Sequence, residues 1–409
     1  MKDSGIDWIG KIPDEWTTRQ IRYLFEIRDE RNYKPLSEVN LISVYTDKGV
    51  LQHSDIEQTT GNKAQNADGY KHVYKNDLVV NIILCWMGAL GISDFDGVTS
   101  PAYDVYSPKN LDLIFPKYYH YLFRTPQFNG KCYTEGRGIM QMRWRTYSSE
   151  FKSIKIPLPP LSEQTKIANF LDKKCAQIDS IIEESKKSIE EYKSWKQSMI
   201  FEAVTGKNNR KKWKQEKLKY LADYNIESLS EETNGDFNFD YIDIGSVKFG
   251  EGIISKENMN FKVAPSRARR IVKEGDVIIS SVRTYLRAIA KIEKSDVPQI
   301  VSTGFVVFTP KKEKITSDFL YYAISSENLI EQVESNSVGI SYPAINAIDI
   351  VNFKIPLPSI KEQEEIVIEI DAKCAQIDSL ISEKQSLIKD LAEYKKSLIF
   401  EAVTGKRRV

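Results

Sequence analysis

The side chains best suited to binding chemistry are arginines, which occur in three clusters with glutamine, tyrosine and tryptophan among them. Arginine and glutamine make bidentate hydrogen bonds to guanine and adenine edges, and arginine also neutralises phosphate. Taken singly, each residue is better interpreted as part of a solvated charged face. As clusters in equivalent places of two domains, they favour nucleic-acid binding, and the candidates are Arg137, Gln141, Arg143, Arg145, Arg267, Arg269, Arg270, Arg283, Tyr285 and Arg287.

Motifs of the common catalytic and nucleotide-binding sites are absent from the sequence. Gly250 and Gly252 lack the third glycine of a dinucleotide-binding loop, and Gly206-Lys207 lacks the upstream glycine of a phosphate-binding loop. The proline motif of amino-methyltransferases and the acidic motif of nucleases are missing as well. We therefore expect a non-catalytic chain. An enzyme is the alternative, and methyl transfer by this chain alone would reveal it.

Composition limits the class of protein and the kind of partner. A length of 409 residues predicts two or three domains. The formal net charge of +1 argues against a protein that is basic over its whole surface. A polyanionic partner would therefore have to bind local basic patches.

Cysteine usage and hydropathy bear on metal binding and compartment. The four cysteines and three histidines are not spaced as zinc ligands, so no metal site is expected. Cys175 and Cys374 fall in an apolar helical pattern and should be buried. The N-terminal stretch is polar and the longest apolar run is short and interrupted, which predicts a cytoplasmic protein without a membrane segment.

One segment of the sequence occurs twice. Residues 156–207 and 355–406 align without a gap at an offset of 199 residues, and 28 of the 52 positions are identical. The identities concentrate in the stretches IPLP, EQ, KCAQIDS and IFEAVTGK. Two copies are too few for a solenoid, so the repeat predicts internal pseudo-two-fold symmetry within one chain.

Each copy of the repeat predicts one long helix. The opening IPLPP is extended, because a residue before proline avoids the helical region, and Ser162 can cap the helix that follows. No proline or glycine interrupts residues 163–205, and Gly206 suits the end of the helix. A helix of about 43 residues is roughly 65 Å long and needs a partner to cover its apolar stripe.

Apolar residues in both copies follow a heptad spacing, which predicts a coiled coil. The other such stripe in the chain is the repeat copy, so we expect the two helices to pair with each other in antiparallel orientation. Ser185, Lys196, Lys384 and Lys395 interrupt the stripe and either face solvent or mark where a partner sits. The central pairing residues are Ile178, Ile182, Ile189, Ile377, Ile381 and Ile388.

The segments that precede the two helices are diverged copies of one α+β domain. The strand patterns NDLVVNII and EGDVIISSV, and the helical patterns PKYYHYLFRT and SDFLYYAISS, occur in the same order. The sequence thus predicts a first domain at residues 1–155, a first helix at 156–207, a second domain at 208–354 and a second helix at 355–409. The basic run at 207–219 is interpreted as a solvated linker, with phosphate contact as the alternative.

Several short motifs, together with the duplication, match one family. They are WIGKIPDEW at Trp8–Trp16, IPLPPLSEQ and IPLPSIKEQ, the repeated KCAQID, NDLVVN with WMGALG, SPAYDVY, and GIS followed by Tyr342-Pro343-Ala344. On these motifs the chain resembles the specificity (S) subunit of type I restriction-modification enzymes over its full length. The proline-to-EQ junction before a long helix, present twice, is the most specific of them.

The resemblance implies both a fold and a set of partners. It implies two target recognition domains that each read one half of a bipartite DNA sequence, joined by the paired helices that set the spacing. It adds Trp86 and Tyr342 to the candidate DNA contacts. It also implies two modification (methyltransferase) subunits, which methylate adenine and dock on the helices, and restriction (translocase-nuclease) subunits with them. S-adenosylmethionine and ATP are expected on those partners, and no cofactor on this chain.

Two other functions stay open at this point. A specificity subunit whose partner fuses methyltransferase and nuclease in one polypeptide would have much the same sequence. A coiled-coil scaffold that pairs two proteins without binding DNA is the second alternative. Neighbouring genes for a methyltransferase and a helicase-nuclease, for a fused enzyme, or for neither would separate the three.

Overall fold

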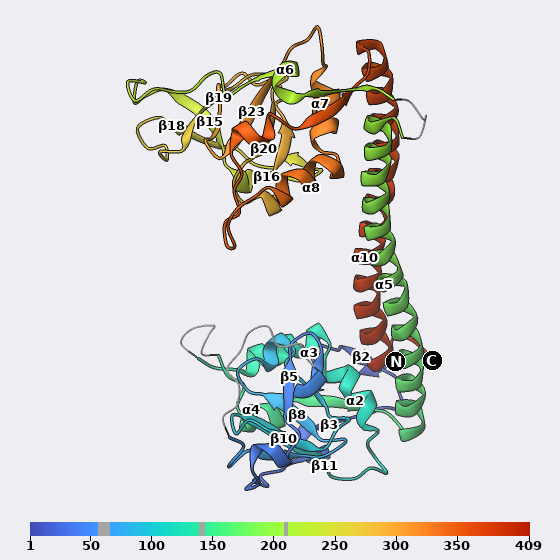
Figure 1. Cartoon of the computed structure of the whole chain (residues 1–409). Helices are drawn as coiled ribbons and strands as arrows, with labels where there is room; N and C mark the ends of the chain where they lie inside the picture. The colour runs from blue at the N-terminus through green and yellow to red at the C-terminus, as the bar shows by residue number, and fades with distance from the viewer. Residues whose placement is uncertain (56–65, 139–143, 208–211) are drawn as a thin grey trace. The chain divides into compact units, whose positions relative to one another are not determined.

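The computed structural model describes residues 1–55, 66–138, 144–207 and 212–409 of the chain. These residues form two compact units. The first unit comprises Met1–Ser185 and Ser386–Val409, and the second comprises Lys186–Gln385. Each unit contains one globular domain and a part of both long helices (Figure 1).

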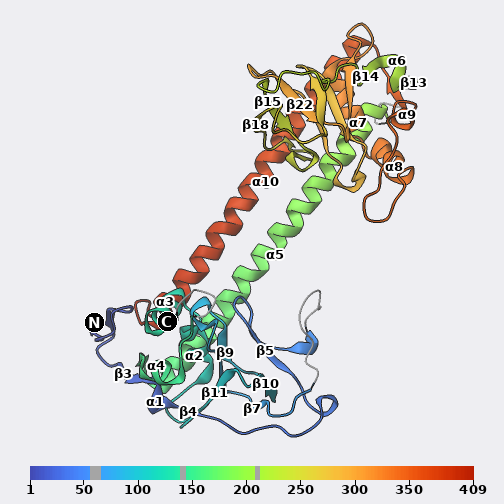
Figure 2. The same cartoon turned by 90° about the vertical axis from the view of Figure 1, so that its left-hand side faces the viewer.

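A four-stranded antiparallel sheet is the centre of the first unit, in the order β4-β11-β8-β9. All four residues of β8 are buried, so both faces of the sheet are covered there. Helix α2 begins at Pro116, where the missing N–H costs nothing, and packs against β9 (Figure 2). The bounds are β4 Phe25–Ile27, β8 Leu78–Asn81, β9 Leu90–Ile92, β11 Tyr103–Pro108 and α2 Pro116–Phe123.

Short strands and helices surround this sheet. Two-stranded ladders pair β1 with β2, β5 with β6, β7 with β10 and β3 with β12. The bounds are β1 Lys2–Asp3, β2 Lys11–Ile12, β3 Thr17–Gln20, β5 Ile42–Tyr45, β6 Gly49–Gln52, β7 Lys71–Val73, β10 Gly97–Thr99 and β12 Lys155–Leu158. The helices are α1 Ile21–Leu24, α3 Pro126–Glu135 and α4 Ser148–Ser153, with 3-10 helices η1 Leu36–Glu38, η2 His53–Asp55 and η3 Cys85–Met87.

The second unit repeats the central sheet in the order β14-β23-β20-β21. It adds a second sheet of order β18-β15-β22-β19, in which β15 and β22 are parallel. The bounds are β14 Ala222–Tyr224, β20 Val277–Ser280, β21 Ile289–Lys291, β23 Phe305–Pro310, β15 Asn238–Ile242, β18 Glu257–Asn260, β19 Ala268–Val272 and β22 Gln299–Ser302.

The remaining elements of the second unit follow the first unit in kind. Helix α7 packs on β20 and β21, as α2 packs on β9, and β24 pairs with β13. The bounds are β13 Lys214–Lys217, β16 Val247–Lys248, β17 Gly252–Ile253, β24 Lys354–Leu357, α6 Leu218–Leu221, α7 Ser317–Ile324, α8 Glu327–Ser335, α9 Ala347–Ile350, η5 Ile244–Ser246 and η6 Thr284–Leu286.

The secondary structure expected for two segments of the first domain is confirmed. The run from Leu78 to Ile92 forms a buried strand, a turn and a second strand, and the tyrosine-rich segment after Phe115 is helical. In the second domain, Arg267, Arg269 and Arg270 all precede the buried strand β20; Arg269 and Arg270 lie within a further strand, β19. The arginines occupy positions of a strand because β19 pairs with the buried strand β22.

The two long helices, α5 Leu161–Thr205 and α10 Ile360–Val403, are antiparallel, as predicted. In the first unit, Lys395 near the end of α10 binds Asp179 in α5 at 2.6 Å. In the second unit, Lys196 near the end of α5 binds Asp378 in α10 at 2.7 Å. The two ion pairs are equivalent in the repeat, because Lys395 and Asp378 lie 199 residues after Lys196 and Asp179. Both pairs form in the same antiparallel register of the helices.

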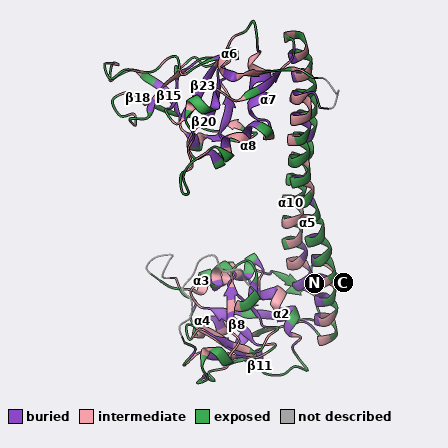
Figure 3. Cartoon of the chain, in the orientation of Figure 1, coloured by how far each residue is buried: buried purple, intermediate pink, exposed green. Residues whose placement is uncertain are grey.

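The helical seam is apolar within each unit. Ile178, Ile189 and Ile377 are buried, while Ile182, Ile381 and Ile388 are partly buried. Of the polar residues in the stripe, Lys196 and Lys395 form the interhelical ion pairs, Ser185 is buried and Lys384 is partly exposed. Figure 3 shows exposed and intermediate residues between the buried ones along both helices.

A buried glutamine fixes each domain to the start of its helix. Gln164 accepts a hydrogen bond from the backbone N–H of Phe115 at 2.8 Å and donates to the carbonyls of Leu113 and Pro159. Its repeat copy, Gln363, makes the same three bonds at equivalent backbone positions: it accepts from Thr316 at 2.9 Å and donates to Lys314 and Pro358. Both glutamines are fully buried. The glutamine of the repeated EQ motif therefore joins each domain to its helix, and we call its three hydrogen bonds the glutamine clamp.

Two further properties of the described residues bear on the sequence analysis. All four cysteines are free and buried, which confirms the expectation for Cys175 and Cys374. Within the described ranges, no helix combines the length and the apolar character that crossing a membrane requires.

The glutamine clamp gives a stability prediction. Gln363→Leu should lower the free energy of unfolding by about 3 kcal/mol, because it leaves one backbone N–H and two carbonyls buried without partners. Gln376→Leu, on the exposed side of the same helix, is the matched control and should change stability by about 0.5 kcal/mol or less. Urea unfolding of both variants measures the difference, and equal midpoints would contradict the clamp.

Candidate nucleic-acid interface

A turn and a loop come together in the second unit where β20 ends. The turn contains the 3-10 helix η6, and the loop is residues 337–344, which follow α8. Val338 and Ala344 close the loop with two backbone hydrogen bonds of 2.8 and 3.0 Å, and Ile345 N–H donates to the carbonyl of Ser281. The hydroxyls of Ser337 and Thr284 lie 2.9 Å apart and join the loop to η6. We call this surface the second platform.

The first unit has the same arrangement at the end of β8. The 3-10 helix η3 follows the strand, and Arg137 and Arg145 close a loop by two backbone hydrogen bonds of 2.9 and 3.0 Å. Thr146 N–H donates to the carbonyl of Ile82, as Ile345 does to Ser281. We call this surface the first platform. The two platforms carry different side chains on one backbone design.

The arginines of the second platform have different environments. Arg287 binds Glu334 at 2.8 Å and Glu327 at 3.1 Å, and the hydrogen bond to Glu334 raises its pKa. Arg283 has its guanidinium 5.4 Å from the ring centre of Tyr342 and pairs with no carboxylate in the part of the chain that the structure describes. Arg287 is thus neutralised within the fold, whereas the charge of Arg283 is available to a ligand.

Three further arginine candidates are on or beside β19. Arg267 donates to the hydroxyl of Tyr241 at 3.2 Å and binds Asp243 at 2.9 Å. Arg269 sits at a bulge of the strand and lies over Phe261, 4.7 Å from its ring centre. Burial lowers the pKa of Arg270, whose buried Nε has no hydrogen-bond partner among the described residues. Arg267 and Arg269 keep partly accessible guanidiniums, and Arg270 is the most enclosed of the three.

The candidates of the first platform are part of an aromatic surface. Trp86 donates to the carbonyl of Ile83 and packs at 5.4 Å from Tyr133, which stacks on Trp144 at 5.0 Å. Arg137 binds Glu150 at 3.2 Å yet remains largely exposed, and Arg145 is exposed. Gln141 and Arg143 lie outside the described residues, so their contacts stay predictions.

The arginine clusters do not occupy equivalent places in the two domains, contrary to the sequence analysis. The loop of Arg137 and Arg145 corresponds to residues 337–344, which contain no arginine. The turn of Arg283 corresponds to that of Leu84 in the first unit, because η3 and η6 follow equivalent strands. The two domains share the backbone arrangement of the platform, but their charged residues occupy different positions on it.

The family of the chain follows from its two matched regions. The family model of the type I restriction modification DNA specificity domain matches residues 13–191 and, a second time, residues 197–390. The chain belongs to this DNA specificity family. Each match runs through one domain and into the helix that follows it, in accord with the repeat.

Curated relatives in this family extend over most of the chain. The type I restriction enzyme MjaVIII specificity subunit of Methanocaldococcus jannaschii is 26% identical over 367 residues, covering 84% of this chain and 83% of the relative. The putative MjaX specificity subunit of the same organism is 24% identical and covers 98% and 96%. The Escherichia coli EcoBI specificity subunit is 27% identical over 273 residues, covering 61% and 58%.

Solved structures share the fold. A chain from a study of complex assembly and conformational transition in the type I R-M system aligns with a TM-score of 0.72 at 17% identity and covers 97% of this chain and 100% of its own length. The HsdS subunit of Thermoanaerobacter tengcongensis aligns with a TM-score of 0.58 at 16% identity, covering 97% and 98%. These likenesses support the fold of two α+β domains with paired long helices.

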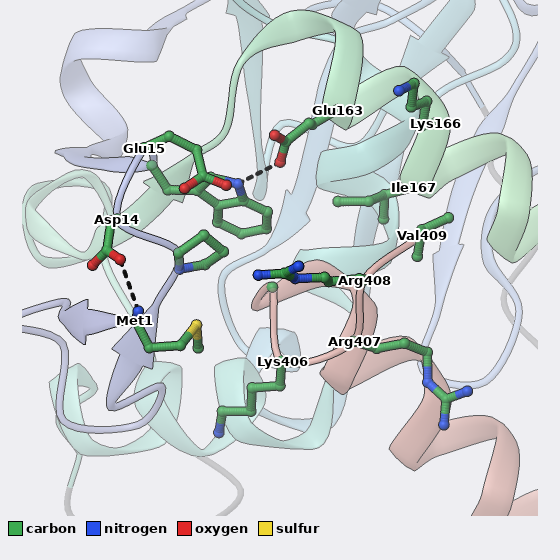
Figure 4. Close-up of a pocket in the computed structure, with 13 residues that line it drawn as sticks. Met1, Asp14, Glu15, Glu163, Lys166, Ile167, Lys406, Arg407, Arg408 and Val409 are labelled. Carbon is green, nitrogen blue, oxygen red and sulfur yellow. Dashed lines mark hydrogen bonds and ion pairs between the residues drawn. The ribbon is translucent and has the colours of Figure 1, made fainter.

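The first unit also contains a pocket of 580 Å³ that is lined by charges of both signs. It lies between the start of α5 and the end of α10 (Figure 4). Trp16 forms one wall and donates to Glu163 at 2.5 Å. Its other charged lining residues include Asp14, Glu15, Lys166 and the basic residues 406–408. Since both signs of charge are interspersed, the lining favours no single class of ligand.

Sequence reasoning missed several positioning residues of the family fold. Besides the glutamine clamp, Tyr121 donates to Asp172 of α5 at 2.7 Å, and Tyr322 donates to the repeat-equivalent Asp371 of α10. The signal was available, because these residues are identical in both copies. Sequence identity between the copies does not by itself show which groups these side chains hydrogen-bond.

The contrast between the two arginines of η6 gives a prediction. Arg287→Ala should lower the free energy of unfolding by about 2 kcal/mol, because two carboxylates lose their shared partner. Arg283→Ala should leave stability unchanged and weaken specific DNA binding by about 1–3 kcal/mol if the side chain contacts a base. Chemical denaturation and DNA titration of both variants measure these effects.

The DNA sequence dependence distinguishes the roles open to Arg283. Equal weakening on every sequence, with a shallower dependence on salt, would assign Arg283 to a phosphate. An Arg287→Ala protein that unfolds like the wild type but no longer binds DNA would contradict the structural role of Arg287.

Proposed function

We propose that this chain is the DNA sequence-recognition subunit of a type I restriction-modification enzyme. Each globular domain binds one half of a bipartite target through its platform. The paired helices set the spacing of the half-sites and carry the partner subunits. The observation that supports this most strongly is the pair of platforms, which share a backbone design and differ in the side chains they present.

The chemistry of the platforms supports two different half-sites. The first platform carries Trp86 and two exposed arginines at the base of its loop. The second has Arg283 where the first has Leu84, and its loop contains Tyr342 instead of arginines. Because arginine hydrogen bonds to guanine edges and phosphates while aromatic and aliphatic groups contact base faces and methyl groups, the two surfaces suit different sequences.

Exposed apolar residues on the helices support docking of two copies of one partner. The first unit exposes Ile181 on α5 and Tyr394 on α10, and the second exposes Leu380 on α10 and Trp195 on α5. Leu380 and Tyr394 are the repeat equivalents of Ile181 and Trp195. An aliphatic and an aromatic side chain are therefore presented twice, as two modification subunits would require.

The partners supply the catalysis in this proposal. Two modification subunits bind S-adenosylmethionine and methylate DNA, and restriction subunits bind ATP and translocate and cleave it. Neither cofactor binds this chain, which is itself non-catalytic and works in the cytoplasm on double-stranded DNA. Isothermal titration of the purified chain with each cofactor tests this division, and micromolar binding of either one would contradict it.

Two other arrangements give different outcomes. A partner gene that fuses methyltransferase and nuclease would place the chain in the related kind of system, with the same role in recognition. A scaffold without a DNA role would bind partners but no duplex. The platforms favour the recognition role, because a scaffold has no need of two domains that present different surfaces on one design.

Mapping of methylated adenines tests the proposal directly. Single-molecule sequencing of a host that carries the modification subunits should detect one bipartite motif with a fixed gap when this gene is present. The motif should be absent from the same host without the gene. Identical methylation in the two hosts would contradict the proposed function.

The two docking surfaces predict a change of stoichiometry. Trp195→Glu and Tyr394→Glu should each reduce the number of bound modification subunits from two to one, because each removes the aromatic contact in one unit. Trp195→Phe keeps an aromatic ring and should still bind two. Native mass spectrometry measures the ratio. Two bound subunits in both glutamate variants would show that the docking surface lies elsewhere.

A further inference from the structure

The loop at residues 337–344 presents apolar side chains to solvent. Ile340 is 103% exposed, and Val338 and Tyr342 are 79% and 68% exposed. Single exposed apolar residues are common on protein surfaces, but here they alternate along one short loop that extends beyond α8 (Figures 1 and 2). Tyr285 of η6, which is 54% exposed, belongs to the same platform. In the described part of the chain, no side chain covers the tip.

The base of this loop holds the tip away from the domain. The paired backbone of Val338 and Ala344 closes the loop, and Ala344 is also bridged to Val282. Gly339 has a φ of +115°, a conformation that side chains disfavour, and a Cβ there would lie 3.1 Å from the carbonyl oxygen of Tyr342. Glycine is therefore favoured at this position, and Ile340 beside it is fully exposed rather than packed on the core.

A positively charged side chain, that of Arg283, lies beside the apolar tip of the loop. The guanidinium of Arg283 lies over the ring of Tyr342, and its charge is not neutralised by any described carboxylate. The neighbouring Arg287, by contrast, is held by two glutamates. An apolar tip with one available arginine suits a duplex, where a phosphate lies next to the stacked bases.

We propose that Ile340 inserts between two base pairs of the half-site that the second domain binds. Apolar wedges such as isoleucine enter base steps in other DNA-binding proteins, where they partly unstack the step and kink the duplex. In this arrangement Arg283 contacts the adjacent phosphate and Tyr342 lies against the displaced base. The inference rests on the proposed function and adds to it a residue that reads DNA by deformation.

A wedge gives sequence preference without hydrogen bonds to bases. Pyrimidine–purine steps such as TA and CA unstack more readily than other steps. The half-site of the second domain should therefore contain such a step at the point of insertion. This contribution is separate from direct contacts made by arginines of the same domain.

Fluorescence of 2-aminopurine, a base whose emission rises when it unstacks, tests the proposal. The full chain, assembled with its modification subunits, is titrated with duplexes that carry this base at each position of the mapped second half-site. The wild type should give a several-fold rise at one step. Ile340→Ala should abolish the rise and weaken binding to that duplex about ten-fold. Ile348→Ala removes the same side chain from another exposed position, on α9, and should behave like the wild type.

The possible outcomes separate the wedge from the proposed function. Specific binding without a rise at any position, or a rise that survives in Ile340→Ala, would overturn the wedge and leave the proposed function intact. Loss of assembly with the modification subunits in Ile340→Ala would assign the loop to a protein partner and also overturn the wedge. Failure of the wild-type assembly to bind any sequence specifically would overturn the proposed function itself.

Discussion

The three hydrogen bonds of one buried glutamine are the constraint on which the rest of this structure depends. Gln164 and Gln363 each join the loop before a domain helix, the proline-rich strand and the first turn of a long helix. A buried amide is tolerated because every bond is made, and a shift of the domain against the helix would leave several groups unpaired. The direction of each platform relative to the start of its own helix is fixed in this way. Divergence of the domains does not disturb it, because the clamp bonds only to backbone.

The helices combine an apolar seam with polar groups that select one register. Heptad packing alone would allow slippage by a whole heptad, since isoleucines recur at the same spacing. The pairs Lys196–Asp378 and Lys395–Asp179 are both satisfied in one alignment. Exposed ion pairs contribute little free energy, so their effect lies in the choice of register. The same repeat that places these ion pairs also places the exposed apolar residues proposed to receive the modification subunits.

The sequence predicts the elements of this fold well and the individual contacts poorly. Duplication, proline and glycine positions and heptad spacing are local or periodic, and they predict both long helices, their antiparallel pairing and the repeated α+β domain. The difference between Arg283 and Arg287 is not local, because it depends on glutamates that α8 brings to one of them. The equivalence of the loops is also hidden in the sequence, because they share a backbone bridge at their base but not the positions of their arginines. Charge is visible in a sequence, whereas its neutralisation is a property of the packed fold.

Because the domains are clamped to their helices and the helices pair in one register, helix length should determine the spacing of the half-sites. Insertion of one heptad at the midpoints of both α5 and α10 tests this dependence, because the seam is preserved while each helix lengthens by roughly 10 Å. Mapping of methylated adenines then returns both half-sites and the gap between them. Unchanged half-sites with a longer gap are the predicted result. Altered half-sites with an unchanged gap would contradict the account.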